Sequence, residues 1–256
     1  MLKTITLIFG VFLALFFIAC DGNKIENPQD KGYDYFPLEI GRSMVYQVDS
    51  VIFDPEIGGI NRKEISLQVK ETVVDTFRDE TNILLYKTER YERPDENHEW
   101  QIKSVFAKGT DEDQAVYISD NLRFIKFIFP PREYKHWDGN VHFDEFLTVE
   151  VAGEPVQIFK SWAYEMTEVA KPLVQDPFQF DEVTTVVNAD NENIIEYRYV
   201  VEKYARGIGL VYREMKILDT QCEACCNNDI NYCESIPWEE KAEAGFILTQ
   251  RLIEYR

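Results

Sequence analysis

Four cysteines near the C-terminus form the densest group of reactive side chains in the sequence: Cys222, Cys225, Cys226 and Cys233. In an exported chain, four thiols this close together favour two disulfides that fasten a loop between two strands. Of the three possible pairings, the one that joins the adjacent Cys225 and Cys226 is strained. We therefore expect either Cys222 with Cys226 and Cys225 with Cys233, or Cys222 with Cys225 and Cys226 with Cys233.

A zinc site of four thiolates is the alternative role for these cysteines. The pair Cys222 and Cys225 has the C-x-x-C spacing of half a zinc site, but Cys226 directly follows this pair and Cys233 stands alone. Redox catalysis would need a helix N-terminus to lower a thiol pKa, and this acidic segment predicts no helix. We predict a structural role for the cysteines and no bound metal.

Histidines are the next candidates for chemistry. His136 and His142 flank a Trp-Asp-Gly-Asn turn, with Asp144 nearby, and such a set could bind zinc. No third ligand has a characteristic spacing, so solvated loop residues are the favoured interpretation, and His98 stands apart. The sequence contains no G-x-S-x-G and no H-E-x-x-H motif. We expect no catalytic residue, no cofactor and no enzymatic activity.

Acidic runs could also bind calcium. Such runs occur at 111–113 and 181–182. Asn188, Asp190 and Glu192 imitate the alternate ligand spacing of a calcium loop, but they lack its glycine and its distal glutamate. A polar hairpin tip is therefore predicted at 188–191.

The N-terminus has the layout of a bacterial lipoprotein signal. Lys3 precedes an uncharged apolar run from Ile5 to Ala19, which is shorter than the roughly 20 residues of a membrane-spanning helix. The run ends in Phe-Ile-Ala-Cys, which resembles a lipobox of the Bacteroidota type. We expect residues 1–19 to be removed as a signal peptide and Cys20 to carry diacylglycerol and a fatty acid such as palmitate. This predicts a lipid-anchored envelope protein, with the outer membrane as its location.

The net charge of the chain excludes some classes of binding partner. Removing residues 1–19 takes one Lys from the 27 basic residues and leaves 26 against 46 acidic ones, a formal charge of −20. Such a chain repels nucleic acid and anionic headgroups, so membrane attachment should depend on the acyl chains. The polar residues 20–33 predict a flexible tether. Residues 34–256 are expected to form a single β-rich domain.

The hydrophobic pattern predicts the fold class. Apolar and polar residues alternate in short runs rich in Val, Ile, Tyr, Phe and Thr, which is typical of strands. Such runs lie at 44–48, 65–69, 83–90, 116–118, 122–128, 183–187, 194–201, 210–217 and 246–255. We expect an all-β antiparallel meander of about ten strands, forming a curved sheet or a partly open barrel. Charged residues such as Lys126 and Arg198 interrupt the strands and argue against a lipid-facing barrel.

Two segments resemble an uncharacterised Bacteroidota envelope lipoprotein family. The stretch Tyr35–Tyr46 resembles its opening F-P-L-x-x-G-x-x-W-x-Y signature, with Met44 in place of the usual Trp, and Tyr204–Tyr212 resembles its Y-A-x-G-[IV]-G-L-V segment. The resemblance implies a β-rich lipoprotein and supplies no catalytic residue. From the sequence, Gly41, Gly207 and Gly209 are assigned structural roles, as glycines allow backbone bends.

Two classes of function remain. A curved sheet around an apolar cavity would bind a lipid-like ligand; alternatively, the body would be an assembly or adaptor module that docks onto another envelope protein. Aromatic residues are abundant and core is their default role, with Trp238 the expected exception. The discriminating property is interior volume, because a carrier needs an unfilled apolar cavity of several hundred Å³.

Overall fold

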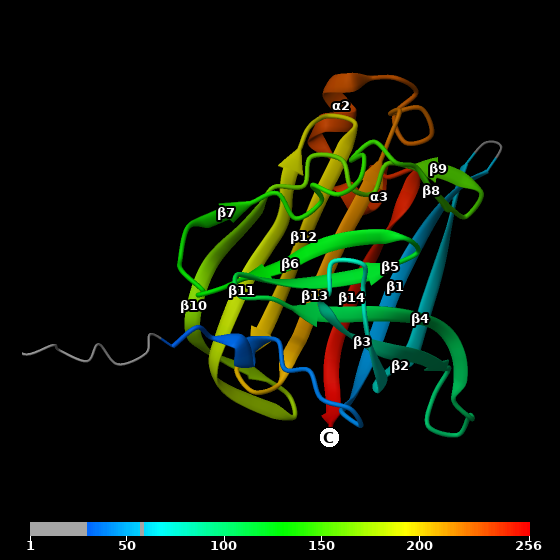
Figure 1. Ribbon diagram of the computed structural model, residues 1–256. Coiled ribbons are helices and arrows are strands. Elements are labelled where there is room, and N and C mark those ends of the chain that lie inside the picture. Colours follow the sequence, from blue (N-terminus) through cyan, green and yellow to red (C-terminus); the bar gives the residue numbers. More distant parts are fainter. Residues whose placement is uncertain (1–29, 57–58) are drawn as a thin grey trace, which may run out of the picture. The chain divides into compact units, whose positions relative to one another are not determined.

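The computed structural model describes residues 30–56 and 59–256 (Figure 1). Lys31–Arg256 form one compact unit. The predicted signal peptide, Cys20 and the tether up to residue 29 lie outside the described residues. Gly32 and Tyr33, which were expected in the tether, already belong to this unit: Gly32 is buried, and the Tyr33 ring lies 4.9 Å from that of Phe129.

The described chain is mostly strand, as the alternation predicts. The elements are η2 (Tyr33–Tyr35), β1 (Ser43–Glu56), β2 (Gly59–Arg78), β3 (Leu84–Arg93), β4 (Gln101–Thr110), β5 (Gln114–Ser119), β6 (Leu122–Ile128), β7 (Lys135–Trp137), β8 (Val149–Val151), β9 (Glu154–Val156), β10 (Tyr164–Gln175), β11 (Phe178–Glu192), β12 (Glu196–Ala205), β13 (Gly209–Asp219), α2 (Ile230–Ser235), α3 (Trp238–Lys241) and β14 (Ala244–Tyr255). Among the described residues, no helix has the length and apolar character needed to cross a membrane.

Twelve strands form one antiparallel sheet, and β8 and β9 form a separate hairpin. The order in the large sheet is β6-β5-β4-β3-β2-β1-β14-β13-β12-β11-β10-β7. The first and last long strands, β1 and β14, pair in the middle of the sheet, from Met44 opposite Tyr255 to Phe53 opposite Gly245. The predicted all-β antiparallel meander with a curved sheet is therefore confirmed.

The sheet rolls up so that its two ends approach each other without closing. The strand at one end, β6, is followed in the chain by β7 at the other end, and the Ile125 amide donates a hydrogen bond to the Gly139 carbonyl just after β7 (2.8 Å). Strands β3 to β6 thereby cross in front of the other strands (Figure 1). Side chains from distant strands consequently meet on the concave face.

Aromatic and branched side chains fill much of this interior. One cluster joins the N-terminal segment to the ends of the sheet through Tyr35, Phe127 and Tyr164. A second lies under the middle strands around Tyr46, Val69 and Leu252. Because aromatic rings each bury a large apolar area, these two clusters contribute strongly to the apolar burial in the body.

Two local expectations were wrong. The polar stretch 188–191 is not a hairpin tip but part of β11, where a register shift between Val187 and Ala189 lets Asn188 point inward and be buried. Trp238 belongs to the core and is 7% exposed, because its ring stacks on Tyr197 and its Nε1 donates to a Glu192 carboxylate oxygen (2.7 Å).

Candidate functional site: the closed end and ionic interior of the sheet

The two segments that carry the family resemblance meet at one end of the rolled sheet. We call residues 32–42 the strap; this segment runs across that end (Figure 1). Arg42 Nη2 donates to the carbonyls of Gly207 (2.7 Å) and Ile208 (3.0 Å), and the Gly207 amide donates to the Asp34 carbonyl (2.7 Å). Segments separated by about 165 residues in sequence are thus joined through charged and backbone hydrogen bonds.

The glycines of these segments have backbone conformations that other residues rarely adopt. Gly41 has φ 91°, Gly207 φ 75° and Gly209 φ 97°. A Cβ at Gly207 would meet nothing within 4 Å, so its requirement is conformational, whereas one at Gly209 would touch the Pro37 ring at 3.4 Å. Glycine at these turns lets the chain enter β1 and β13 directly beside the strap.

A small cavity lies beneath the strap. Its volume is about 50 Å³, and apolar strap residues such as Phe36 and Leu38 line it together with Glu71, Thr88 and Lys108. The Thr88 hydroxyl is buried there without a hydrogen-bond partner among the described residues. A space of this size holds a few water molecules and no acyl chain.

Deeper inside, Glu202 on β12 is the centre of a buried ionic network. Its carboxylate accepts from Lys126 Nζ on β6 (2.8 Å) and from Arg213 Nε and Nη2 on β13 (2.8 Å each). The other carboxylate oxygen accepts from the Tyr204 hydroxyl (2.8 Å) and Asn188 Nδ2 (3.2 Å). Both oxygens of this 1% exposed residue are therefore satisfied, as a buried charge requires.

The network fixes the ionisation of Glu202. Burial opposes the charged carboxylate, but the nearby Lys126 ammonium and Arg213 guanidinium outweigh burial and lower the pKa of Glu202 to about 2. The group stays ionised at neutral pH, where a general acid or base would have to exchange its proton. This arrangement suits the joining of strands and not proton transfer.

A second, partly buried ion pair borders the cavity. Lys108 Nζ on β4 donates to a Glu71 carboxylate oxygen on β2 (2.8 Å). Burial raises the pKa of Glu71, yet Lys108 and Arg90 lower it further, so the net shift is downward. The concave face thus carries ion pairs on both halves of the rolled sheet.

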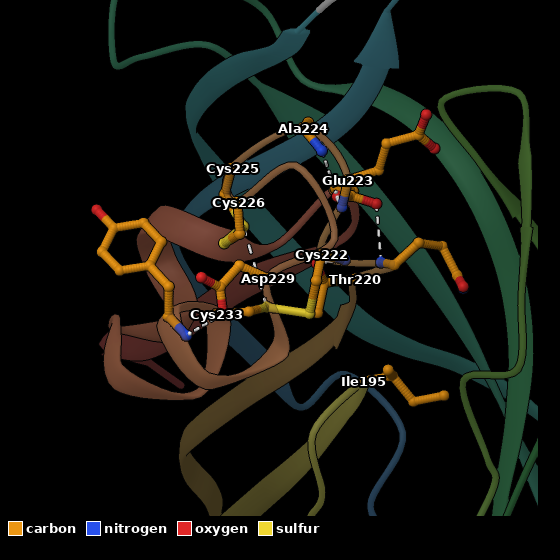
Figure 2. The surroundings of a disulfide bond; sticks show 12 residues. Ile195, Thr220, Cys222, Glu223, Ala224, Cys225, Cys226, Asp229 and Cys233 are labelled. Atoms are coloured by element: carbon orange, nitrogen blue, oxygen red, sulfur yellow. Dashed lines mark hydrogen bonds between the residues drawn. A yellow bond between two sulfur atoms is a disulfide. The ribbon is translucent and has the colours of Figure 1, made fainter.

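The cysteine loop, residues 220–235, lies at the other end of the sheet between β13 and α3. The structure pairs Cys222 with Cys233 and Cys225 with Cys226 (Figure 2). Both pairings favoured from the sequence are therefore wrong. The physical reason is that α2 brings Cys233 back over Cys222, with their Cα atoms 5.7 Å apart, which leaves Cys225 and Cys226 to each other.

The other candidates for chemistry are not brought together. Among the described residues, the cysteines form the single group of three or more His, Cys, Asp or Glu side chains close enough to share a metal ion. His136 Nε2 instead lies 3.7 Å from a Glu165 carboxylate oxygen, and His98 Nδ1 forms a hydrogen bond with an Asp95 carboxylate oxygen (2.9 Å). Asp111 accepts hydrogen bonds from the amides of its own turn.

Strand β2 offers a free edge. Its pairing with β3 begins at Gln68, so within the described part of the chain the ladder partner of residues 62–67 is β1. The Val73 amide donates a hydrogen bond to the Arg42 carbonyl, on the side of β2 that faces β1. Successive amides along a strand point to opposite sides, so every second residue before Val73 also faces β1. The amides of Arg62, Glu64 and Ser66 therefore point to the open side. An open hollow of about 450 Å³, the edge hollow, lies beside this edge and is lined by Ile65, Leu67, Glu92, Arg93, Ile102 and Lys103 among others.

Sequence reasoning missed the ionic interior. Lys126 and Arg198 were interpreted as charges interrupting a strand, whereas they are 7% and 1% exposed. A signal was present, because Lys126 lies two residues after the apolar Phe124 and therefore on the same face of the strand. The sequence did not show which charges of other strands would lie opposite that face.

Comparisons with known proteins give one structural likeness. No family model matches the sequence, and no curated protein matches it. A crystal structure of a Parabacteroides distasonis protein provisionally described as a lipoprotein is similar over 87% of this chain and 98% of that chain, with 10% identity and a TM-score of 0.39. A likeness of this size carries no argument about function, which is drawn from the residues of this chain alone.

Proposed function

We propose that this chain is a lipid-anchored envelope protein that docks onto another envelope protein and performs no chemistry of its own. Anchoring is proposed at Cys20, in the outer membrane, on the strength of the lipobox sequence. Docking, which was the alternative to a lipid carrier, is favoured by the filled interior of the rolled sheet.

The filled interior is the observation that carries the proposal. Ligand-binding cavities typically have volumes of about 300 to 1,000 Å³ and mostly apolar walls. Here the concave face is occupied by the Glu202 network, and the cavity under the strap has about 50 Å³. A lipid would have to displace buried ion pairs, whose separation leaves uncompensated charges at a cost of several kcal/mol.

The free edge of β2 supports protein recognition in particular. An extended peptide can add a strand to an exposed edge, with its side chains entering neighbouring pockets. The edge hollow supplies such a pocket, with Ile65 and Ile102 for apolar side chains. Its charged lining is mixed and includes Arg93 and Lys103 as well as Glu92 and Glu99, in contrast with the acidic chain as a whole. We propose an extended segment of an envelope protein, with alternating apolar residues, as the occupant.

Site-specific photocrosslinking in intact cells tests this function. A photoreactive residue replaces the exposed Lys63 beside the edge, and the same residue at exposed Val174 on β10 is the control. We expect one defined protein adduct from position 63, absent from position 174 and abolished when Glu64→Pro removes an edge amide. Lipid extraction of the purified protein is the second measurement.

The crosslinking and lipid-extraction results distinguish a docking protein from a lipid carrier. A single adduct whose yield depends on the edge amide supports docking. Equal adducts from both positions, or no adduct together with one equivalent of a non-covalently bound lipid per chain, would overturn it in favour of a carrier.

A further inference from the structure

We propose that the cysteine loop, once its disulfides are reduced, binds one soft divalent cation such as Zn²⁺ or Cd²⁺ through its four thiolates. This inference is independent of the proposed docking function. It rests on how the folded loop brings together sulfur atoms whose sequence spacing matches only half of a zinc site.

Three of the four sulfur atoms lie close enough to share one ion once the disulfides are opened, and the fourth is bonded to one of these three. The Sγ atoms of Cys225, Cys226 and Cys233 all lie within 4.8 Å of one another, and Cys222 is bonded to Cys233. The Sγ atoms of Cys225 and Cys233, which are not bonded to each other, are 4.0 Å apart. In a tetrahedral zinc site with Zn–S bonds of about 2.3 Å, neighbouring sulfurs are about 3.8 Å apart.

Hydrogen bonds hold this arrangement independently of the sulfur–sulfur bonds. The Asn228 amide donates to the Cys222 carbonyl (2.8 Å), and the Asp229 amide to the Cys226 carbonyl (2.9 Å). Asp229 caps α2 by accepting from the Tyr232 amide (3.2 Å), and the Cys233 amide donates to the Asp229 carbonyl (2.9 Å). Each sulfur-bearing turn is thus positioned by its own backbone.

A carboxylate fixes the base of the loop. The Glu243 carboxylate accepts from the amides of Gln221 (2.8 Å), Glu223 (2.9 Å) and Ala224 (2.9 Å). Figure 2 shows the two disulfides near each other, with a dashed line that joins Cys225 to Cys233. Cys222, Cys226 and Cys233 are buried and Cys225 is partly exposed, so a cation would be shielded from water while keeping one route of entry.

The conversion of disulfides into a cation site is chemically balanced. Each disulfide takes two electrons and two protons from an external dithiol, which is oxidised to a disulfide, and so yields two thiols. The cation then displaces the four thiol protons and forms four metal–sulfur bonds, because only thiolates ligate it. A soft cation is specified because thiolate ligands select soft metals.

Cadmium titration of the reduced chain tests the inference. The purified full chain is reduced in guanidinium and refolded without oxygen, with and without Cd²⁺, and the ultraviolet thiolate-to-metal charge-transfer band is recorded. We expect saturation at one Cd²⁺ per chain with the intensity of four thiolates. Cys225→Ser should remove about a quarter of the band and lower the Cd²⁺ affinity at least tenfold.

Alkylation provides a readout that does not depend on a fully native body. Iodoacetamide is added with and without Cd²⁺, and peptide mass spectrometry follows each of the four cysteines separately from Cys20. Protection of all four by one equivalent of Cd²⁺ is expected, and Ser235→Ala on α2 should behave as the unaltered chain. Four cysteines that remain freely alkylated, or a band that grows without an endpoint at one equivalent, would overturn the inference.

Discussion

The Lys126 ammonium lies 2.8 Å from a carboxylate oxygen of Glu202, although the two residues belong to β6 and β12 and are far apart in the order of the sheet. This contact is possible because the sheet rolls until its ends approach. It connects the two halves of the rolled sheet through the interior, together with Arg213.

Breaking this contact should destabilise the fold strongly. Lys126→Met leaves the buried Glu202 with one cationic partner, and removing a partner from a buried pair costs about 3 to 5 kcal/mol. For a body of this size, thermal unfolding should then shift down by roughly 10 °C. Lys171→Met breaks the exposed pair with Glu133 (3.2 Å) and is the control, expected to leave the unfolding temperature almost unchanged because solvent screens exposed pairs. Equal shifts for the two variants would contradict a structural role for the interior pair.

Stability should fall in acid because of Glu202. Its pKa is about 2 in the folded protein and about 4.3 in an unfolded chain, so the folded state favours the ionised form. The resulting stabilisation, about 3 kcal/mol, is fully present above the unfolded pKa and is lost as pH falls from about 5 toward 2. Urea unfolding across this range should show a shallower pH dependence in Glu202→Gln than in the unaltered protein. An unchanged slope would assign the acid sensitivity to other carboxylates.

The free edge of β2 predicts opposite effects for two neighbouring proline substitutions. Glu64 directs its amide to the open side, so Glu64→Pro should keep the ladder with β1 and lower stability by at most about 1 kcal/mol. Ile65→Pro removes an amide that faces β1 and should cost about 3 kcal/mol or more. Circular dichroism during thermal unfolding measures both variants. A larger loss for Glu64→Pro would place its amide in the ladder and remove the proposed docking edge.

The strap should loosen when its charged hydrogen bonds are removed. Arg42→Met deletes the two bonds from Arg42 to the carbonyls of Gly207 and Ile208, each worth about 1.5 to 3 kcal/mol for a charged donor. Hydrogen exchange at the Gly207 amide, which donates to Asp34, should then accelerate by more than tenfold, whereas exchange at the Ile247 amide in the central β14 should change little. Uniform acceleration at both amides would indicate global destabilisation instead.

The proposed lipidation at Cys20 can be tested directly. Labelled fatty acid should be incorporated into the unaltered chain and be absent from Cys20→Ala, because the predicted lipobox would direct modification to that thiol. Metabolic labelling followed by immunoprecipitation measures it, with Cys225→Ala as the control that should label normally. Equal labelling of the unaltered chain and Cys20→Ala would contradict the predicted anchor.

The sequence alone determined the fold class and most strand positions, since alternation of apolar and polar residues is a local property of each strand. Strands with weak alternation were not predicted, among them β4 and β10. In β4 the polar pair Lys103-Ser104 precedes three apolar residues, and in β10 the polar pair Thr167-Glu168 precedes two apolar residues, so apolar and polar residues do not alternate there. The sequence also identified the two segments, around Phe36 and Gly207, that meet where the strap crosses one end of the rolled sheet. It did not indicate that these segments touch.

Only the tertiary structure decided which side chains meet. Lys126 reaches Glu202, and Arg42 reaches Gly207, because the sheet rolls and the strap crosses its end, and strand order is set by long-range pairing. The cysteine pairing likewise depended on α2, which returns Cys233 to Cys222 against the local expectation. Periodicity records the face on which a residue lies, but it contains no information on the residue opposite, and this partner determines whether a buried charge is stable.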